Sequence, residues 1–350
     1  MKIYKNIFEK LISLENLFTA WDAFKNDKTN RYDVQVFERR LEENIFELHR
    51  DLKTKKYKHG VYTGFWIRDP KPRHIHKATV RDRVLHHAVF NILNPIFEPT
   101  FISHSFSCRI GKGTHKGIKA LKQIADKISE NGHKNIFALK CDIKKFFDSV
   151  NHDLLIKIFD KKIKDDDAMW LLSEIVRSFI SKDANIFEHK GMPIGNLTSQ
   201  LFANVYMNEF DQFMKHGIHA KHYLRYTDDF VVISDSKDYL EKLIPQVNQF
   251  LKEKLGLDLH PNKVTIRKFR QGIDFLGYVI LPHHQQIRTK TKKRIFKKVF
   301  RRVLEQKQGL ISNETLEQSL QSYLGVLGHA DSYKLSQELK NKFWFWLTEN

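Results

Sequence analysis

The stretch from Tyr223 to Ser234 constrains the fold more than any other, because two acids interrupt an otherwise apolar pattern. The residues on both sides of Asp228 and Asp229 are mostly β-branched, aromatic or leucine, which favours two strands joined by a tight turn. Two carboxylates about 4 Å apart repel each other by about 4 kcal/mol at an effective dielectric constant near 20. We therefore expect a hairpin whose acids need a cation, although a plain polar turn would give the same local pattern.

A second acid ends another apolar run much earlier in the chain. Residues 136–143 read as a buried strand that carries Asp142 near its end. A carboxylate in that position is costly unless a positive charge neutralises it. If this strand lies beside the hairpin, the acids Asp142, Asp228 and Asp229 form a cluster suited to two divalent ions. Mg²⁺ prefers such hard oxygen ligands, and we expect two Mg²⁺ ions, with Mn²⁺ able to replace them.

The charge balance points to a polyanionic partner. The 350 residues include 60 Lys and Arg against 41 Asp and Glu, a formal net charge of +19. Nucleic acid is the first candidate for such a partner. The alternatives are that the protein docks on an anionic lipid surface, or that it is a generally basic protein without a polyanionic partner. No apolar run is long enough to cross a membrane, no secretory signal opens the sequence, and the two cysteines are too few for a disulfide framework. We expect a cytoplasmic protein without a membrane partner.

Periodicity gives a coarse order of elements. Residues 1–60 read mostly as helix, residues 64–75 as extended chain, and residues 79–98 and 116–130 as helices. Asp165-Asp166-Asp167 reads as the start of a further helix. The glycines of the segment Arg109–Gly117 stand among basic residues that could bind phosphate, but their spacing matches neither a Walker loop nor a dinucleotide-binding fingerprint.

Together, these motifs resemble those of reverse transcriptases. The resemblance rests on the Asp-x-x-x-Phe-Phe strand end at Asp142, the Tyr-x-Asp-Asp hairpin at Tyr226, and the order of the segments between them, from about Pro70 onward. It implies an α+β right-hand polymerase of fingers, palm and thumb, with an antiparallel palm sheet backed by helices and a helical thumb. The expected domains are a basic helical extension at 1–69, fingers at 70–135, a palm at 136–281 with fingers-associated helices at 151–190, and a thumb at 282–350.

The resemblance also assigns roles to single residues. It implies that the three aspartates bind metal together with the backbone carbonyl of Ile143, and that Lys263 protonates the departing pyrophosphate. Phe147 takes the position of a steric gate against ribonucleotides, while Lys71 and Arg73 match residues that clamp the triphosphate. The alternative for Phe147 is that it is only an aromatic residue of the core, and the alternative for Lys263 is that it is a solvated lysine in a loop. The other implied sites are the nucleotide-binding positions Ile194, Gly195 and Gln200, the primer grip Phe275-Leu276-Gly277, and the template–primer backbone contacts Arg294, Lys297, Lys298 and Arg301.

The segment Gly191–Gln200 narrows the resemblance further. Its Ile-Gly-x-x-x-Ser-Gln form is similar to the reverse transcriptases of diversity-generating retroelements, whereas group II intron enzymes carry Gln-Gly-x-x-x-Ser-Pro. Isoleucine offers no side-chain hydrogen bond, and we expect Ile194 to weaken discrimination opposite template adenines. The resemblance thus implies an error-prone RNA-directed DNA polymerase that copies a template-repeat RNA to diversify a target gene. A reverse transcriptase of a defence system, retron or group II intron is the alternative, followed by a non-catalytic RNA-binding protein of the same fold.

The partners expected from this resemblance are template RNA, an RNA–DNA hybrid and deoxynucleoside triphosphates. The family also works with a small basic accessory variability protein that assembles as a pentamer, a partner that the resemblance alone implies.

Overall fold

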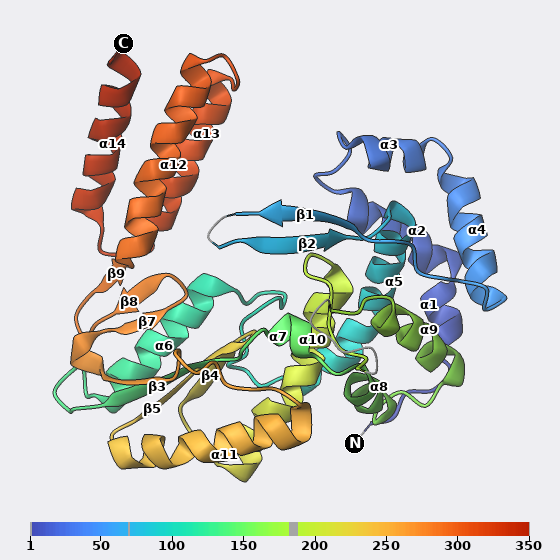
Figure 1. Cartoon of the computed structure of the whole chain (residues 1–350), viewed down its shortest axis with the longest axis horizontal. Coiled ribbons are helices and arrows are strands. Elements are labelled where there is room, and N and C mark those ends of the chain that lie inside the picture. Colours follow the sequence, from blue (N-terminus) through green and yellow to red (C-terminus); the bar gives the residue numbers. More distant parts are fainter. Residues whose placement is uncertain (1, 69–70, 182–187, 350) are drawn as a thin grey trace.

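A four-stranded antiparallel sheet lies at the centre of the chain, between helices on both sides (Figure 1). The structure is a computed structural model that describes residues 2–68, 71–181 and 188–349. The strand order is β4-β5-β3-β6, so strands distant in the sequence are neighbours. These strands span Phe137–Asp142 (β3), Tyr223–Tyr226 (β4), Asp229–Ser234 (β5) and Thr265–Lys268 (β6).

The two faces of this sheet have different coverings, because side chains alternate between faces along a strand. Leu139 and Cys141 face a core that they share with α10 (Leu197–Gln212) and α11 (Lys237–Leu255). Ala138 faces the opposite side, where α6 (Thr114–Ile128) and a small second sheet pack. The second sheet has the order β7-β8-β9. Its strands span Ile273–Phe275 (β7), Tyr278–Ile280 (β8) and Gln285–Ile287 (β9).

Helices of the first hundred residues form a separate layer beside the sheet, together with two helices from the middle of the chain (Figure 1). The longest helix of this layer, Val80–Phe97 (α5), packs against both α2 and α10 and so joins the layer to the sheet. An antiparallel hairpin of β1 (Thr63–Ile67) and β2 (Arg73–Lys77) extends from this layer. The other helices of the layer are α1 (Phe8–Ile12), α2 (Leu14–Lys25), α3 (Tyr32–Glu38), α4 (Leu41–Lys53), α8 (His152–Asp160) and α9 (Asp166–Arg177).

Three helices at the C-terminal end enclose a hydrophobic cluster of their own. They are α12 (Thr289–Lys307), α13 (Asn313–Leu327) and α14 (Tyr333–Thr348), and they extend from the small sheet away from the central one (Figure 1). The short elements that complete the chain are η1 (Glu98–Thr100), α7 (Phe146–Ser149), η2 (Phe213–Gly217) and η3 (Phe269–Gln271).

The elements agree with the periodicity of the sequence. The helices expected at 79–98 and 116–130 and the strand expected at 136–143 all form within two residues of those bounds. Asp165 begins α9 as expected: its side chain accepts a hydrogen bond from the amide of Ala168 (3.0 Å) and also binds the amide of Ile7 (2.6 Å). The expected boundary at 69–70 and residues 182–187 lie outside the described residues. No described helix is long and apolar enough to cross a bilayer.

Candidate active site

The hairpin of β4 and β5 fixes two of the acids at its turn. Tyr226 pairs with Asp229, which leaves Thr227 and Asp228 as a two-residue turn. Thr227 has φ +55°, a conformation that a β-branched residue rarely adopts without outside support. Two hydrogen bonds hold it there: Arg225 Nη1 donates to the Thr227 carbonyl (2.9 Å), and Thr227 Oγ1 donates to Ser107 Oγ (2.5 Å). The acids are therefore presented on a rigid turn.

The third acid lies directly beside this turn. Asp142 is the last residue of β3 and is the Cα partner of Asp229 across the sheet. The amide of the next residue, Ile143, donates a hydrogen bond to the Asp228 carbonyl (3.3 Å). The structure thus brings Asp142, Ile143, Asp228 and Asp229 together at one end of the central sheet.

Two lysines approach these carboxylates. Lys263 Nζ lies 2.6 Å from Asp142 Oδ1, and Lys140 Nζ lies 3.9 Å from Asp229 Oδ1. The loop that carries Lys263 is anchored to the end of β3, because the His260 amide donates to the Asp142 carbonyl (2.8 Å). Lysine ammonium groups therefore partly neutralise the acids. The sequence singled out Lys263 but not Lys140.

Burial disfavours the ionised forms of both acids at the turn. Burial, followed by repulsion from Asp229 and Asp142, raises the pKa of Asp228 to about 6. Burial also raises the pKa of Asp229; Lys140 opposes that rise and Asp142 adds to it. Carboxylates whose ionised form is disfavoured in this way are stabilised when a further cation binds.

A fully buried ion pair that was not predicted from the sequence lies beneath the turn. Arg225 of β4 and Asp211 of α10 are both 0% exposed, with Arg225 Nε 2.8 Å from Asp211 Oδ1 and Arg225 Nη2 2.6 Å from Asp211 Oδ2. The Tyr223 hydroxyl donates to the same carboxylate (2.7 Å). Because Arg225 also binds the Thr227 carbonyl, this network connects the helix behind the sheet to the turn that carries the acids. The arginine within the otherwise apolar strand could have indicated this ion pair, because a buried charge needs a partner.

The segment Gly191–Gln200 lies between Phe147 and the β1–β2 hairpin. The Met192 amide donates to the Phe147 carbonyl (2.6 Å), and the His76 amide of β2 donates to the Ile194 carbonyl (3.0 Å). Gly195 has φ +110°, and a Cβ there would lie 2.7 Å from Ile75 Cγ2, so both conformation and close packing require glycine. Phe147 and Ile194 are half-buried, whereas Gly195 and Gln200 are exposed.

The expected triphosphate clamp lies at the far end of the same hairpin. Arg73 is the first residue of β2 and Lys71 precedes it in the turn, and both are exposed. This end of β1 and β2 lies on the side of the C-terminal helices (Figure 1). The structure places these two residues on the exposed end of an element that is itself attached to the Ile194 segment.

The expected primer grip forms the turn between β7 and β8. Phe275 pairs with Tyr278, which leaves Leu276 and Gly277 at φ +50° and +93°. Positive φ at both positions is the geometry of a type I′ hairpin turn. The Gly277 carbonyl accepts a hydrogen bond from the amide of Arg288 (3.0 Å), which ties this turn to the residue that precedes α12.

The basic residues expected to follow the nucleic-acid backbone lie on α12. Ile295, Val299 and Val303 face the cluster inside the three-helix unit, so the basic positions occupy the rest of the helix surface. Lys297 and Arg301 are exposed, and Arg301 is paired with Glu305 on the same helix (2.8 Å). Arg294 and Lys298 are half-buried.

The reverse transcriptase (RNA-dependent DNA polymerase) family matches residues 54–280, which is more than half of the chain. The chain belongs to this family. It is 27% identical over 237 residues to protein YkfC of Escherichia coli K12, covering 58% of this chain and 61% of that protein. It is 25% identical over 311 residues to the group II intron-encoded protein LtrA of Lactococcus lactis, covering 68% and 50%. The putative COX1/OXI3 intron 2 protein of Saccharomyces cerevisiae is 20% identical over 293 residues, covering 66% and 33%. The chain therefore spans less than two thirds of the length of each of these relatives.

Reverse transcriptases generally use divalent metal ions, and the acids at this turn have the ligand chemistry that such ions prefer. Among the described residues, no three His, Cys, Asp or Glu side chains are grouped so as to hold a metal ion. The Asp142 carboxylate contacts the Lys263 ammonium group (2.6 Å). The donor set remains suitable, since carboxylate oxygens are the ligands that Mg²⁺ prefers. Burial, followed by repulsion among the acids, raises the pKa values of Asp228 and Asp229, so a bound cation would favour their ionised forms.

Proposed function

We propose that this reverse transcriptase is an active RNA-directed DNA polymerase that extends a primer with deoxynucleotides along an RNA template. The observation that carries the proposal is the meeting of Asp142, Asp228 and Asp229 at one end of the central sheet. Two Mg²⁺ ions held there would activate the primer 3′-hydroxyl and stabilise the leaving pyrophosphate. The residues that would hold them are the three aspartates and the backbone carbonyl of Ile143.

Lys263 is placed to supply a proton in this reaction. Its ammonium group contacts Asp142 at 2.6 Å, so it lies at the acids where pyrophosphate leaves. An ammonium group that donates a proton to a departing oxygen acts as a general acid. We assign that role to Lys263, and the exposed Lys71 and Arg73 are assigned to the triphosphate.

Phe147 and the Ile194 segment form the proposed nucleotide-binding wall. Phe147 packs edge-on against Phe146 with ring centroids 5.3 Å apart, which limits its movement. A ring fixed at that position would collide with a ribose 2′-hydroxyl. We propose that Ile194 contacts the nascent base pair from the neighbouring segment, where it offers only apolar contact.

A basic cavity supports a template path next to Gly195 and Gln200. Its volume is about 270 Å³, and both residues line it. Its other walls include the cationic side chains Lys28, Arg31, Lys77 and Arg83. Positive side chains around a cavity of this kind attract nucleic-acid phosphates without regard to sequence.

The remaining parts fit the proposed right hand. The central sheet with its helices corresponds to the palm, the N-terminal helices and the β1–β2 hairpin to the fingers, and α12–α14 to the thumb. The turn at Phe275–Gly277 would hold the primer end, and the basic positions of α12 would follow the backbone of the hybrid. The domain bounds 1–69, 70–135, 136–281 and 282–350 belong to this proposal.

Two subclasses remain as candidates, each favoured by a different observation. The intron-encoded relatives favour a reverse transcriptase of group II intron type. Ile194 and Gln200 favour an error-prone enzyme of a diversity-generating retroelement, together with its pentameric accessory protein. Because these relatives are intron proteins, we place the group II intron hypothesis first and keep the retroelement hypothesis as the alternative. One measurement of copying fidelity decides between them.

Primer extension tests the polymerase proposal. With an RNA template, a DNA primer and Mg²⁺, we expect full-length product from deoxynucleotides and little from ribonucleotides. The Asp228→Asn variant should give no product, while Lys268→Gln, an exposed change on β6, should match the unmodified enzyme. Extension that continues in Asp228→Asn at the original rate would contradict the assigned role of the acids.

Sequencing of the products decides between the subclasses. Frequent errors opposite template adenines, reduced in Ile194→Gln but not in the apolar control Ile194→Leu, would support the retroelement reading. Errors that are rare and equal at all four template bases would support the intron-type reading.

A further inference from the structure

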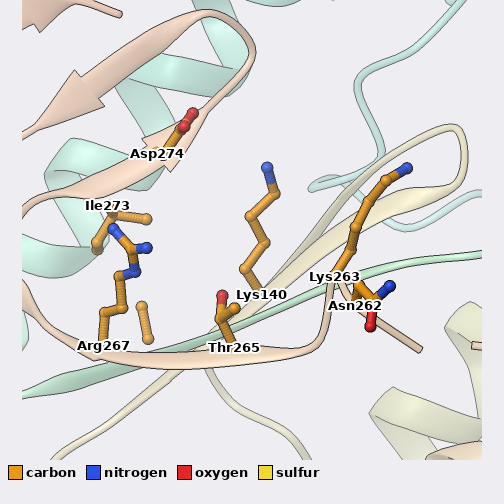
Figure 2. A pocket seen from close by; sticks show the side chains of 8 residues that line it. Lys140, Asn262, Lys263, Thr265, Arg267, Ile273 and Asp274 are labelled. Carbon is orange, nitrogen blue, oxygen red and sulfur yellow. The ribbon is translucent and has the colours of Figure 1, made fainter. Parts of the chain in front are cut away.

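A small basic cavity adjoins the acids on the edge of the central sheet. It lies between β3, β6 and β7, and its lining includes Lys140 of β3, Arg267 of the edge strand β6 and Lys263 of the loop before β6 (Figure 2). Asp274 of β7 lies across the cavity from them (Figure 2). Nothing in the proposed mechanism uses Arg267 or the space that it borders.

The strand register explains why these cations meet. Ala138 pairs with Arg267 and Lys140 pairs with Thr265 across β3 and β6. Paired residues of an antiparallel sheet point to the same face, so Arg267, Thr265 and Lys140 share one side. The next position along each strand on that face holds Asp142 and Lys263, which are in contact at 2.6 Å. The cavity and the acids are therefore consecutive parts of one surface.

The charges in the cavity are unbalanced. Its single carboxylate, Asp274, forms an ion pair with Arg288. Lys140 and Lys263 contact Asp229 and Asp142, which lie at the border of the cavity rather than within it. Among the residues that the structure describes, no carboxylate lies within ion-pair distance of Arg267. An anion is the ligand that this arrangement can bind, and Thr265 and Asn262 add neutral hydrogen-bonding groups.

The size of the cavity limits that anion. Its volume is about 200 Å³, below the roughly 300 Å³ at which pockets for drug-sized molecules begin. A small phosphate anion fits within this volume. The guanidinium of Arg267 and two ammonium groups together favour an anion with several negative charges.

We propose that this cavity binds inorganic pyrophosphate after it leaves the acids. The proposal rests on the proposed polymerase function, in which pyrophosphate is the product released at Asp142 and Asp228. Lys263 and Lys140 each lie between the acids and the cavity, so pyrophosphate can exchange one set of contacts for the next as it departs. Arg267, at the far side from the acids, is a product-binding residue.

Binding of pyrophosphate to the full chain tests the proposal without catalysis. Isothermal titration is carried out without nucleic acid and without divalent ions, because pyrophosphate itself binds Mg²⁺. We expect tighter binding of pyrophosphate than of orthophosphate or sulfate, and a loss of about tenfold or more in Arg267→Ala, the range for a hydrogen bond between charged groups. The matched control is Lys268→Ala, which removes the same charge from the next residue, exposed and on the opposite face. The control should bind pyrophosphate as the unmodified chain does.

Three results would overturn the proposal. They are equal affinities in the two variants, equal affinities for pyrophosphate and sulfate, and a loss in Arg267→Ala that accompanies a lower melting temperature absent from Lys268→Ala. Thr265→Val, which removes only a neutral hydroxyl from the cavity, provides a second variant if Arg267→Ala does not fold. It should weaken pyrophosphate binding severalfold, and unchanged binding would count against the site.

Enzyme kinetics can distinguish a binding site for the product pyrophosphate from one for the substrate triphosphate. In primer extension, Arg267→Ala should raise the inhibition constant for pyrophosphate about tenfold and leave the KM for deoxynucleotides unchanged. A raised KM with an unchanged inhibition constant would assign the cavity to the substrate triphosphate and refute the proposal. If the chain binds pyrophosphate through Arg267 but extends no primer, the polymerase proposal fails and the anion site remains. If it extends primers but binds no pyrophosphate there, only the present inference fails.

Discussion

Replacing Asp211 by asparagine tests whether the buried ion pair holds the catalytic turn. The substitution keeps the shape of the side chain but removes its charge and one of its two acceptor oxygens. The new amide nitrogen would stand 2.6 Å from Arg225 Nη2, so two donors would face each other. Because both side chains are 0% exposed, water cannot replace the lost partner.

The expected cost is large. Breaking a buried ion pair from one side destabilises a protein by about 3–5 kcal/mol, because it leaves an uncompensated charge. Total stabilities are roughly 5–15 kcal/mol, so Asp211→Asn should lose a large share of the folding free energy. Urea unfolding followed by circular dichroism measures this loss. The control is Asp238→Asn, which removes a carboxylate from an exposed position of α11 and should change stability by less than about 0.5 kcal/mol.

A second variant separates stability from positioning. The combination Asp211→Leu, Arg225→Met and Tyr223→Phe replaces the buried charges and the hydroxyl by apolar groups, an exchange that is often neutral or stabilising. We expect it to regain most of the stability but not primer extension, since the Thr227 carbonyl has lost its donor. A cost below about 1 kcal/mol for Asp211→Asn, or full activity in the apolar variant, would refute the reasoning.

Three further predictions concern the site and the thumb. Phe147→Ala should allow ribonucleotide incorporation, seen as a fall of at least tenfold in the ratio of kcat/KM for deoxynucleotides over ribonucleotides; an unchanged ratio would make Phe147 a core residue only. In the metal-free protein, Asp228→Asn should raise stability by about 1–2 kcal/mol above pH 6, because the raised pKa of about 6 means that ionised Asp228 destabilises the folded state. This gain should shrink as the pH falls through 6 and vanish below about 4, where the aspartate is neutral in both states; a gain independent of pH would exclude the electrostatic cause. Lys297→Gln on α12 should lower the slope of log affinity against log salt for an RNA–DNA hybrid by about 0.9, and Lys242→Gln on α11 should leave it unchanged; equal slopes in both would remove α12 from the interface.

Much of the fold could be predicted from the sequence, because local patterns encode it. The apolar flanks of Asp228 and Asp229 specify a hairpin, and the apolar run before Asp142 specifies a strand. Helical periodicity located α5 and α6. Each of these elements depends only on the residues of its own segment. The sequence of that segment is therefore enough to predict the element.

The contacts that the sequence did not predict all join distant segments. The pairing of Arg225 with Asp211 depends on how α10 packs behind β4, and the contact of Lys263 with Asp142 depends on the register of β3 and β6. Neither packing nor register is specified by local pattern.

Cleavage by bound iron tests the central claim most directly. Fe²⁺ that replaces Mg²⁺ reduces added hydrogen peroxide to a hydroxyl radical and hydroxide and is oxidised to Fe³⁺. The radical cuts the backbone next to the ligands of the ion, so fragment masses locate the ion within the full chain. Bound to template, primer and deoxynucleotide, the enzyme should be cut near residues 142 and 228, with excess Mg²⁺ suppressing the cuts and Asp229→Asn abolishing them. Cuts at other positions, or cuts near 142 and 228 that persist in Asp229→Asn, would contradict the account.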